Sequence, residues 1–200
     1  QTFKWGGVQS RSDILFAMGV GFYNNYVSTT QHWLPCYDLP SDKASLRFSF
    51  IVPAGKVVAS NGILTEVKHP GDGTDVYVWE HNNDCATYNY TFAAADYVTV
   101  NFGNEQLQKV VYCKPADTTS TKTVFKLLPQ MINTYEKIFG AYPFDKVGYV
   151  LTPIGSMEHE TMISMDEDLV RGSKDTINLT GAHELSHQWF GDMVTPFDFR

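Results

Sequence analysis

The spacing of apolar residues changes partway along the chain, and this change most limits the fold. Up to about residue 114, apolar and polar residues alternate in short runs, as in residues 45–52, which Pro53 terminates. A period of two predicts strands with one buried face. From residue 124 to residue 139, apolar residues recur at helical spacing instead. The sequence therefore predicts a first part made of strands and a second part that contains helices.

Glycine-containing turns separate the strand-like runs of the first part. Asn61-Gly62 lies between two apolar runs, and an Asn-Gly pair is a strong hairpin signal because both residues tolerate positive φ. Residues 71–73 read Gly-Asp-Gly and separate two further runs in the same way. Short strands joined by tight turns predict a sandwich or a curved open sheet.

Two helices are predicted in the second part. The first has helical spacing over residues 124–139, and the polar residues 118–123 could start it; Pro129 predicts either a kink or a division into two shorter helices. The second carries two histidines; Asp175 or Thr176 is expected to cap its start, and Gly191 is expected to end it.

The order of these elements predicts an α+β fold. Residues 1–114 are expected to form a mostly antiparallel β domain that is truncated at its start, since the chain lacks a natural beginning such as Met. Residues 115–200 are expected to form part of a second domain, in which residues 147–151 make a buried strand before the histidine-bearing helix.

Composition and charge describe an ordinary globular protein. The chain is 43% hydrophobic and 18% charged, which excludes a disordered segment. Its formal net charge is −7 and it has no cluster of Lys and Arg, so it lacks the electrostatic footprint of a protein that binds nucleic acid. The longest apolar run, residues 14–22, is too short to span a bilayer.

Three widely spaced cysteines, Cys36, Cys85 and Cys113, match neither a redox motif nor a cysteine zinc site. They allow one disulfide if the protein is exported, or three buried thiols, so the cell compartment stays open. His32, His69 and His81 show no ligand spacing and are predicted to be loop or core residues.

Residues 183–187 read His-Glu-Leu-Ser-His, and this stretch has the pattern of a metal-binding catalytic site. Side chains four residues apart lie on one face of a helix, so the imidazoles of His183 and His187 can reach one ion. Zinc accepts nitrogen ligands in this arrangement and keeps a position for water in catalytic sites. Glu184 can take a proton from that water, whose pKa the metal lowers.

The motif alone does not settle the function, because the same letters occur by chance on ordinary amphipathic helices. Catalytic zinc sites also need three protein ligands. Two side-chain carboxylates follow His187, those of Asp192 and Asp198. Asp192 is five residues past His187, so on a continuing helix it would not lie on the same face as the histidines. Asp198 stays open as the third ligand, but a residue beyond Arg200 is the favoured expectation.

Several segments together resemble the M1 family of zinc aminopeptidases, the gluzincins. Residues 183–192 read His-Glu-Leu-Ser-His-Gln-Trp-Phe-Gly-Asp and resemble the zinc helix of that family. Residues 155–159 read Gly-Ser-Met-Glu-His and are similar to its Gly-x-Met-Glu-Asn motif. Residues 33–38 and 135–144 also resemble family segments, so the resemblance runs from about residue 31 to the end. It implies a β domain followed by the start of a thermolysin-like α/β catalytic domain.

The resemblance implies the metal site and the catalytic base. His183 and His187 match the two histidine ligands of one Zn²⁺ ion, and Glu184 matches the general base. The family's third ligand is a glutamate, which would lie past Arg200 together with a tyrosine that stabilises the tetrahedral intermediate. A polypeptide that ended at Arg200 is expected to bind zinc weakly and to turn over little substrate.

The resemblance also implies how substrate is held. Glu158 matches the glutamate that binds the free α-amino group, which would make cleavage start at the N-terminus of a peptide. Gly155, Ser156 and Met157 match the strand edge along which the substrate backbone lies. The alternative is that Glu158 is a solvated loop carboxylate with no role in binding. His159 stands where the family usually has Asn and could alter the amine pocket.

Three other functions within this family remain open on sequence grounds. A zinc endopeptidase would lack the amine anchor, and an epoxide hydrolase would need a lipid tunnel. A non-catalytic relative that serves as a binding module would be expected to have lost zinc ligands, which His183 and His187 argue against.

Overall fold

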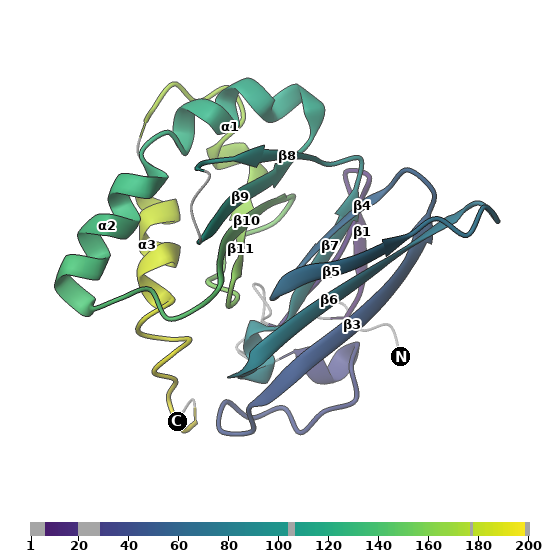
Figure 1. The fold of residues 1–200 in the computed structure, drawn as a ribbon, viewed down its shortest axis with the longest axis horizontal. Coiled ribbons are helices and arrows are strands. Elements are labelled where there is room, and N and C mark those ends of the chain that lie inside the picture. The colour runs from purple at the N-terminus through teal and green to yellow at the C-terminus, as the bar shows by residue number, and fades with distance from the viewer. Residues whose placement is uncertain (1–6, 20–28, 104–106, 177, 199–200) are drawn as a thin grey trace.

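A computed structural model describes residues 7–19, 29–103, 107–176 and 178–198 of the chain. Its strands form three sheets, and its helices lie beside the third of them (Figure 1). The mixed α+β fold predicted from the sequence is confirmed: antiparallel sheets come first along the chain, and a part with helices follows.

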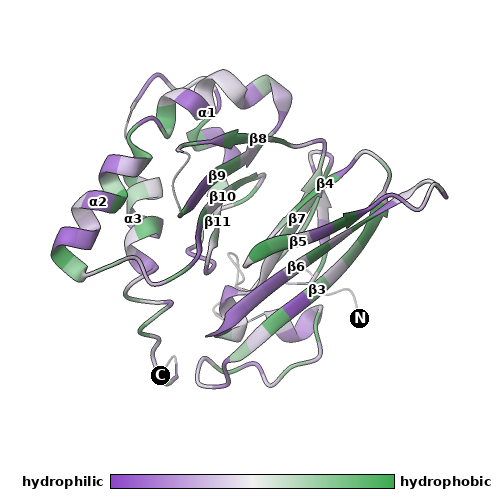
Figure 2. Cartoon of the chain, in the orientation of Figure 1, coloured by the Kyte–Doolittle hydropathy of each residue, from purple (hydrophilic) through white to green (hydrophobic). Residues whose placement is uncertain are grey.

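The first sheet has the order β1-β2-β7-β4 and is antiparallel throughout. The second sheet has the order β3-β6-β5 and is also antiparallel. The strands of these two sheets are β1 (Gln9–Arg11), β2 (Ile14–Met18), β3 (Ala44–Pro53), β4 (Val57–Ser60), β5 (Ile63–Lys68), β6 (Thr74–Cys85) and β7 (Thr91–Ala95). The predicted strand at residues 45–52 lies in β3, where Figure 2 shows hydrophilic and hydrophobic stretches in turn.

One apolar core serves both antiparallel sheets. Phe16 and Ala93 enter it from the first sheet and Trp79 enters it from the second. Val150 and Met162, which belong to the third sheet, pack into the same core. The three sheets are therefore held together by buried apolar contacts, which are the main favourable term in folding.

The predicted hairpin at Asn61-Gly62 is wrong. β4 pairs with β7 and β5 pairs with β6, so the chain leaves one sheet and enters the other at this point. Gly62 has a φ of 73°, and a Cβ there would lie 2.0 Å from the carbonyl oxygen of Glu80. Only glycine fits this corner, which explains why the residue pair looks like a turn signal without making a hairpin.

The second predicted hairpin is confirmed. β5 and β6 pair antiparallel on either side of residues 71–73, where both glycines have positive φ.

The third sheet has the order β11-β10-β9-β8 and contains β8 (Val98–Asn101), β9 (Gln108–Cys113), β10 (Lys146–Thr152) and β11 (Met162–Asp166). β9, β10 and β11 are parallel, whereas β8 is antiparallel to β9. Every residue of β10 is buried, as predicted for residues 147–151. β8 and β9 precede residue 114 yet share this sheet, and the division of the chain at that residue stays a prediction.

The predicted helix at residues 124–139 is divided in two. α1 (Thr118–Val124) ends before α2 (Leu128–Phe139) begins, so the interpretation as two shorter helices is correct and the kink is not. Pro129 lies in the first turn of α2, where its missing N–H would have had no partner within the helix. Short 3₁₀ helices cover Thr30–His32, Thr87–Asn89, Pro115–Asp117 and Glu167–Leu169.

α1, α2 and α3 (Leu179–His187) pack against the third sheet around a second apolar core. Leu128 and Ile132 of α2 meet Leu185 of α3 there, and Tyr149 of β10 lies in the same cluster. Trp189, just past α3, is fully buried, and its Nε1 donates to the carbonyl of Gly140 at 3.0 Å. This packing holds α3 and the residues that follow it in place.

Two further expectations concern membranes and thiols. Within the described ranges, no helix is long and apolar enough to cross a membrane. The three cysteines are free thiols rather than a disulfide; Cys85 and Cys113 are buried, and Cys36 is half-buried.

Candidate metal centre

α3 begins later than the sequence predicts. Its cap is Asn178, whose Oδ1 accepts a hydrogen bond from the backbone N–H of Gly181 at 3.0 Å, rather than Asp175 or Thr176. The helix ends at His187, before the predicted stop at Gly191. Asn is among the best capping residues because its side-chain oxygen satisfies an N–H that the helix itself leaves unpaired.

The two histidines of α3 face each other. The Nε2 atoms of His183 and His187 lie 3.2 Å apart, and the ring planes meet at 84°. Two nitrogen ligands that bind one zinc ion at about 2.0–2.1 Å with tetrahedral angles would lie roughly 3.3 Å apart. The separation of the two nitrogens therefore suits a shared ion.

The tautomer of His187 is determined by a backbone carbonyl. Its Nδ1 lies 2.8 Å from the oxygen of Phe190, and a carbonyl can only accept a hydrogen bond. The proton must then be on Nδ1, which leaves the lone pair of Nε2 directed toward His183. Metal-binding histidines are commonly held by a hydrogen bond of this kind on their other nitrogen.

Glu184 lies on the buried side of the same helix. Burial raises the pKa of its carboxyl to about 7, the nearby Glu158 carboxylate contributes to this rise, and His187 opposes it. A pKa near neutrality is suited to a group that accepts and returns protons.

The segment with the other predicted residues runs beside β11. Met157 forms two backbone hydrogen bonds with Ser164 of β11, each 3.0 Å long. The Oγ of Ser156 accepts from the backbone N–H of Asp166 at 3.1 Å. Gly155 precedes them with a φ of 58°, and Glu158 follows as a half-buried residue.

Gln188 connects α3 to this segment, and sequence reasoning missed it. Its Nε2 donates to the carbonyl of Glu158 at 2.7 Å, and its Oε1 accepts from the N–H of Thr161 at 3.0 Å. The Tyr142 hydroxyl lies 3.0 Å from the same Oε1 and 2.9 Å from the carbonyl of Lys146, so its one proton can go to either acceptor. Gln188 directly follows His187, so one buried side chain determines where the backbone of Glu158 lies relative to the histidines. No periodicity or motif spacing signals this role.

Asp192 also has a structural role. Its two carboxylate oxygens accept from Asn89 at 2.8 Å and from Gln188 at 2.6 Å. Lys43 donates to its backbone carbonyl at 3.0 Å. These contacts join the antiparallel part of the chain to the end of α3, and they agree with the low weight given to Asp192 as a metal ligand.

His159 is fully buried, with its Nδ1 3.0 Å from the Oγ of Ser164. Burial lowers the pKa of its imidazole to about 3, so the side chain is neutral near pH 7. Its influence on an amine pocket stays a prediction.

The described residues contain one group of three or more converging His, Cys, Asp or Glu ligands, and it does not include His183 and His187. The structure thus brings the two predicted ligands together, with Glu184 and Glu158 electrostatically coupled beside them. The roles of these residues remain predictions.

Profiles of a single peptidase family match two parts of the chain. The Peptidase M1 N-terminal domain matches residues 28–89, and the Peptidase family M1 domain matches residues 123–199. Probable aminopeptidase 1 of Sulfurisphaera tokodaii is 26% identical over 210 residues, which cover 96% of this chain and 27% of that protein. Aminopeptidase M1-B of Oryza sativa subsp. japonica is 30% identical over 175 residues, which cover 80% of this chain and 20% of that protein.

Solved structures show the same fold. The M1 zinc metallopeptidase from Deinococcus radiodurans superposes with a TM-score of 0.78 at 22% identity, covering 99% of this chain and 44% of that one. A mutant two-domain M1 zinc metallopeptidase bound to L-arginine gives a TM-score of 0.80 at 22% identity, covering 96% of this chain and 43% of that one. This chain therefore spans less than half the length of each of these relatives. From its sequence and fold together, the chain belongs to the M1 family of peptidases.

Proposed function

We propose that this chain is part of a zinc aminopeptidase that hydrolyses the N-terminal peptide bond of peptides. The observation that carries the proposal is the pair of Nε2 atoms 3.2 Å apart on α3, with the proton of His187 held on Nδ1 by a carbonyl. The Nε2 of His183 can donate a hydrogen bond to the lone pair of His187 or, with its own proton on Nδ1, can share one cation with it.

The donors fit zinc. His183 and His187 would hold one Zn²⁺ ion, and a third protein ligand, expected from the family resemblance to be a glutamate, would complete the set. When bound, zinc lowers the pKa of water and polarises the scissile carbonyl.

Glu184 is the proposed general base. It accepts a proton from the attacking water and returns it to the amine that leaves. Its buried position supports this role, because burial raises its pKa to about 7 when no metal is bound and so favours proton uptake. A bound cation would shift this pKa downward, so Glu184 would be ionised when substrate arrives.

Glu158 is the proposed anchor of the free N-terminus. A carboxylate held near the reacting bond pairs with the terminal ammonium and makes the first peptide bond the one that is cut. Gln188 supports this geometry, since its amide fixes the carbonyl of Glu158. Gly155, Ser156 and Met157 would provide the backbone edge for the substrate, beside β11.

The relatives support peptide substrates. Two of them are named as aminopeptidases, and a mutant of the Deinococcus radiodurans enzyme was crystallised with a Tyr-Ser-Ala substrate.

The test compares full-length wild-type protein with Glu184→Gln on an aminoacyl-amide substrate. Gln keeps the size of the side chain but cannot accept the proton, so we expect kcat/KM to fall by at least about 100-fold while zinc content is retained. Equal turnover by the two proteins would refute the mechanism.

Glu158 is tested separately with paired peptides. Glu158→Ala should lose activity on peptides with a free N-terminus, and acetylated peptides should be poor substrates of the wild type. A folded Glu158→Ala protein with full activity would favour a zinc endopeptidase instead.

A further inference from the structure

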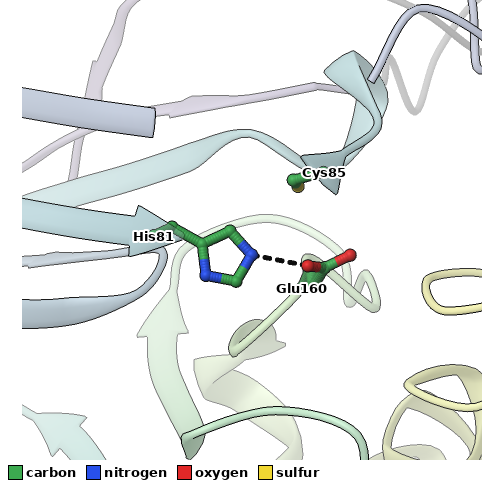
Figure 3. A group of neighbouring side chains, drawn as sticks. All are labelled: His81, Cys85 and Glu160. Carbon is green, nitrogen blue, oxygen red and sulfur yellow. Dashed lines mark hydrogen bonds and ion pairs between the residues drawn. The ribbon is translucent and has the colours of Figure 1, made fainter. Parts of the chain in front are cut away.

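A second cluster of metal-ligating side chains lies away from the histidine pair of α3. His81 and Cys85 belong to β6, and Glu160 lies in the segment between β10 and β11 (Figure 3). Their ligand atoms all lie within 4.8 Å of one another. All three are almost completely buried, with exposed fractions of 4%, 0% and 1%.

An irregularity in β6 brings two of the three together. On a regular strand, residues four apart are separated by about 13 Å along the chain direction. Between His81 and Cys85, however, the pairing with β3 shifts: Cys85 lies opposite Ala44, and His81 lies opposite Leu46. Four steps on β6 therefore correspond to two on β3, which is a bulge that redirects side chains.

The chemistry of the donors suits a divalent transition metal. An imidazole nitrogen, a thiolate and a carboxylate are all established zinc ligands. A thiolate and a carboxylate carry two negative charges, which with a neutral imidazole balance a divalent cation. Tetrahedral zinc ligands lie roughly 3.3–3.8 Å apart, so small side-chain rotations would bring these atoms into position.

Without an ion, each member of the cluster has a hydrogen-bond contact, and the contact of Cys85 is the weakest. His81 Nε2 lies 2.5 Å from Glu160 Oε1, whereas the Sγ of Cys85 has a weak contact of 3.5 Å with the neighbouring carbonyl of Ala86. Burial, and next the Glu160 carboxylate, raise the pKa of the Cys85 thiol well above its ordinary value. An ion would displace that proton, as metals do at cysteine sites.

One of the three proposed ligands also borders a cavity. His81 lines a cavity of about 250 Å³ together with Thr161 and Lys146.

We propose that His81, Cys85 and Glu160 bind a zinc-class divalent ion at a site separate from the histidine pair of α3. The ion joins β6 to the segment that carries Glu158, two residues before Glu160. Its role is structural: it holds that segment against the antiparallel sheets, alongside the hydrogen bond from Asn61 to the carbonyl of Glu160 at 2.6 Å.

The test uses full-length protein that has been stripped with a chelator and titrated with Co²⁺. A thiolate bound to Co²⁺ gives a charge-transfer absorption that histidine and carboxylate ligands do not. We expect this absorption in the wild type and its loss in Cys85→Ser. Cys36→Ser and Cys113→Ser are matched controls that should keep it.

A His183→Ala/His187→Ala variant separates this site from the proposed catalytic one, and it should retain the thiolate absorption. Glu160→Gln preserves side-chain size and should weaken Co²⁺ binding by at least about 10-fold, which gives a second measurement if Cys85→Ser does not fold. Absence of the absorption in wild type, or its survival in folded Cys85→Ser, would overturn the proposal and leave a buried His–Glu pair beside a thiol.

Discussion

The side chain of Gln188 donates to Glu158 and Asp192 and accepts from Thr161, and its Oε1 also lies 3.0 Å from the Tyr142 hydroxyl. An amide offers two N–H donors and a carbonyl with two lone pairs, so both donors and at least one lone pair are used. All of this occurs out of contact with water, because Gln188 is fully buried. At the scale of the residue, this amide links the proposed ligand His187 to the proposed anchor Glu158.

Replacing Gln188 with Leu should destabilise the protein strongly. The substitution leaves a buried N–H and a buried carboxylate oxygen without this partner, and each such loss costs about 1–3 kcal/mol. We expect the free energy of unfolding to fall by roughly 3 kcal/mol or more in urea titrations. Gln130→Leu, at an exposed position of α2, should change it by less than about 0.5 kcal/mol. Similar effects of the two substitutions would contradict the role of Gln188.

His159 should make the free energy of unfolding fall as pH falls. Its folded pKa is about 3, below the value of about 6.5 expected in the unfolded chain. As pH falls below about 6.5, the unfolded chain takes up a proton that the folded chain excludes, so stability is lost. The contribution is up to about 1.4 kcal/mol per pH unit. His159→Asn should therefore lose less stability than wild type between pH 7 and pH 5 in urea titrations; parallel losses would disprove this.

At the scale of the element, local signals located the helices but not their ends. The 3.6-residue spacing predicted α2, and Pro129 predicted that the pattern would break. The same signals could not show that Asn178 rather than Asp175 caps α3, because neighbouring polar residues have similar capping ability. The folded backbone decides between them, since the N–H of Gly181 donates to the Oδ1 of Asn178. The proposed metal ligands His183 and His187 lie on the helix that begins after this cap.

Removing the cap should weaken α3. Asn178→Ala eliminates the acceptor for the Gly181 N–H and should lower the free energy of unfolding by about 1 kcal/mol. Asn178→Asp keeps the acceptor but loses the hydrogen bond that Nδ2 donates to the carbonyl of Leu169 at 3.3 Å, so it should restore part of the loss. Asn133→Ala, on the exposed face of α2, provides a control for the loss of an amide. Equal stabilities of Asn178→Ala and wild type would show that the cap contributes nothing.

At the scale of the molecule, buried polar groups join sheets that are far apart in sequence. Lys146 of β10 is fully buried, donates to the carbonyl of Ser60 in β4 at 2.8 Å, and lies over the ring of Trp79 at 4.3 Å. Asn61 connects to Glu160 across 99 residues. Such contacts hold the third sheet to the antiparallel sheets.

Lys146 should make stability rise with pH. Burial lowers the pKa of its ammonium well below the ordinary value, so at neutral to mildly alkaline pH the unfolded chain binds a proton more tightly than the folded chain does. Stability then increases as pH rises toward about 10, where the unfolded lysine also loses its proton. Lys146→Met should lack this increase in urea titrations at pH 7 and pH 9. An equal increase in both proteins would contradict the shift.

Part of this protein could be predicted because the relevant forces act between neighbouring residues. Alternation in residues 45–52 and helical spacing in α2 depend on which side chains share a face, and the four-residue spacing of His183 and His187 determines that both rings lie on one side of a helix. For the same reason, the motif predicted a metal site before any contact was known.

Tertiary structure alone decided the rest. Asn61-Gly62 forms a corner between two sheets because β4 and β5 pair with different strands. Gln188 links two segments because Glu158 and Thr161 pack against its side chain. His81 contacts Glu160, which lies 79 residues later in the chain. The free energy of such contacts depends on burial and on distant segments converging, and neither quantity is encoded in the spacing of adjacent residues.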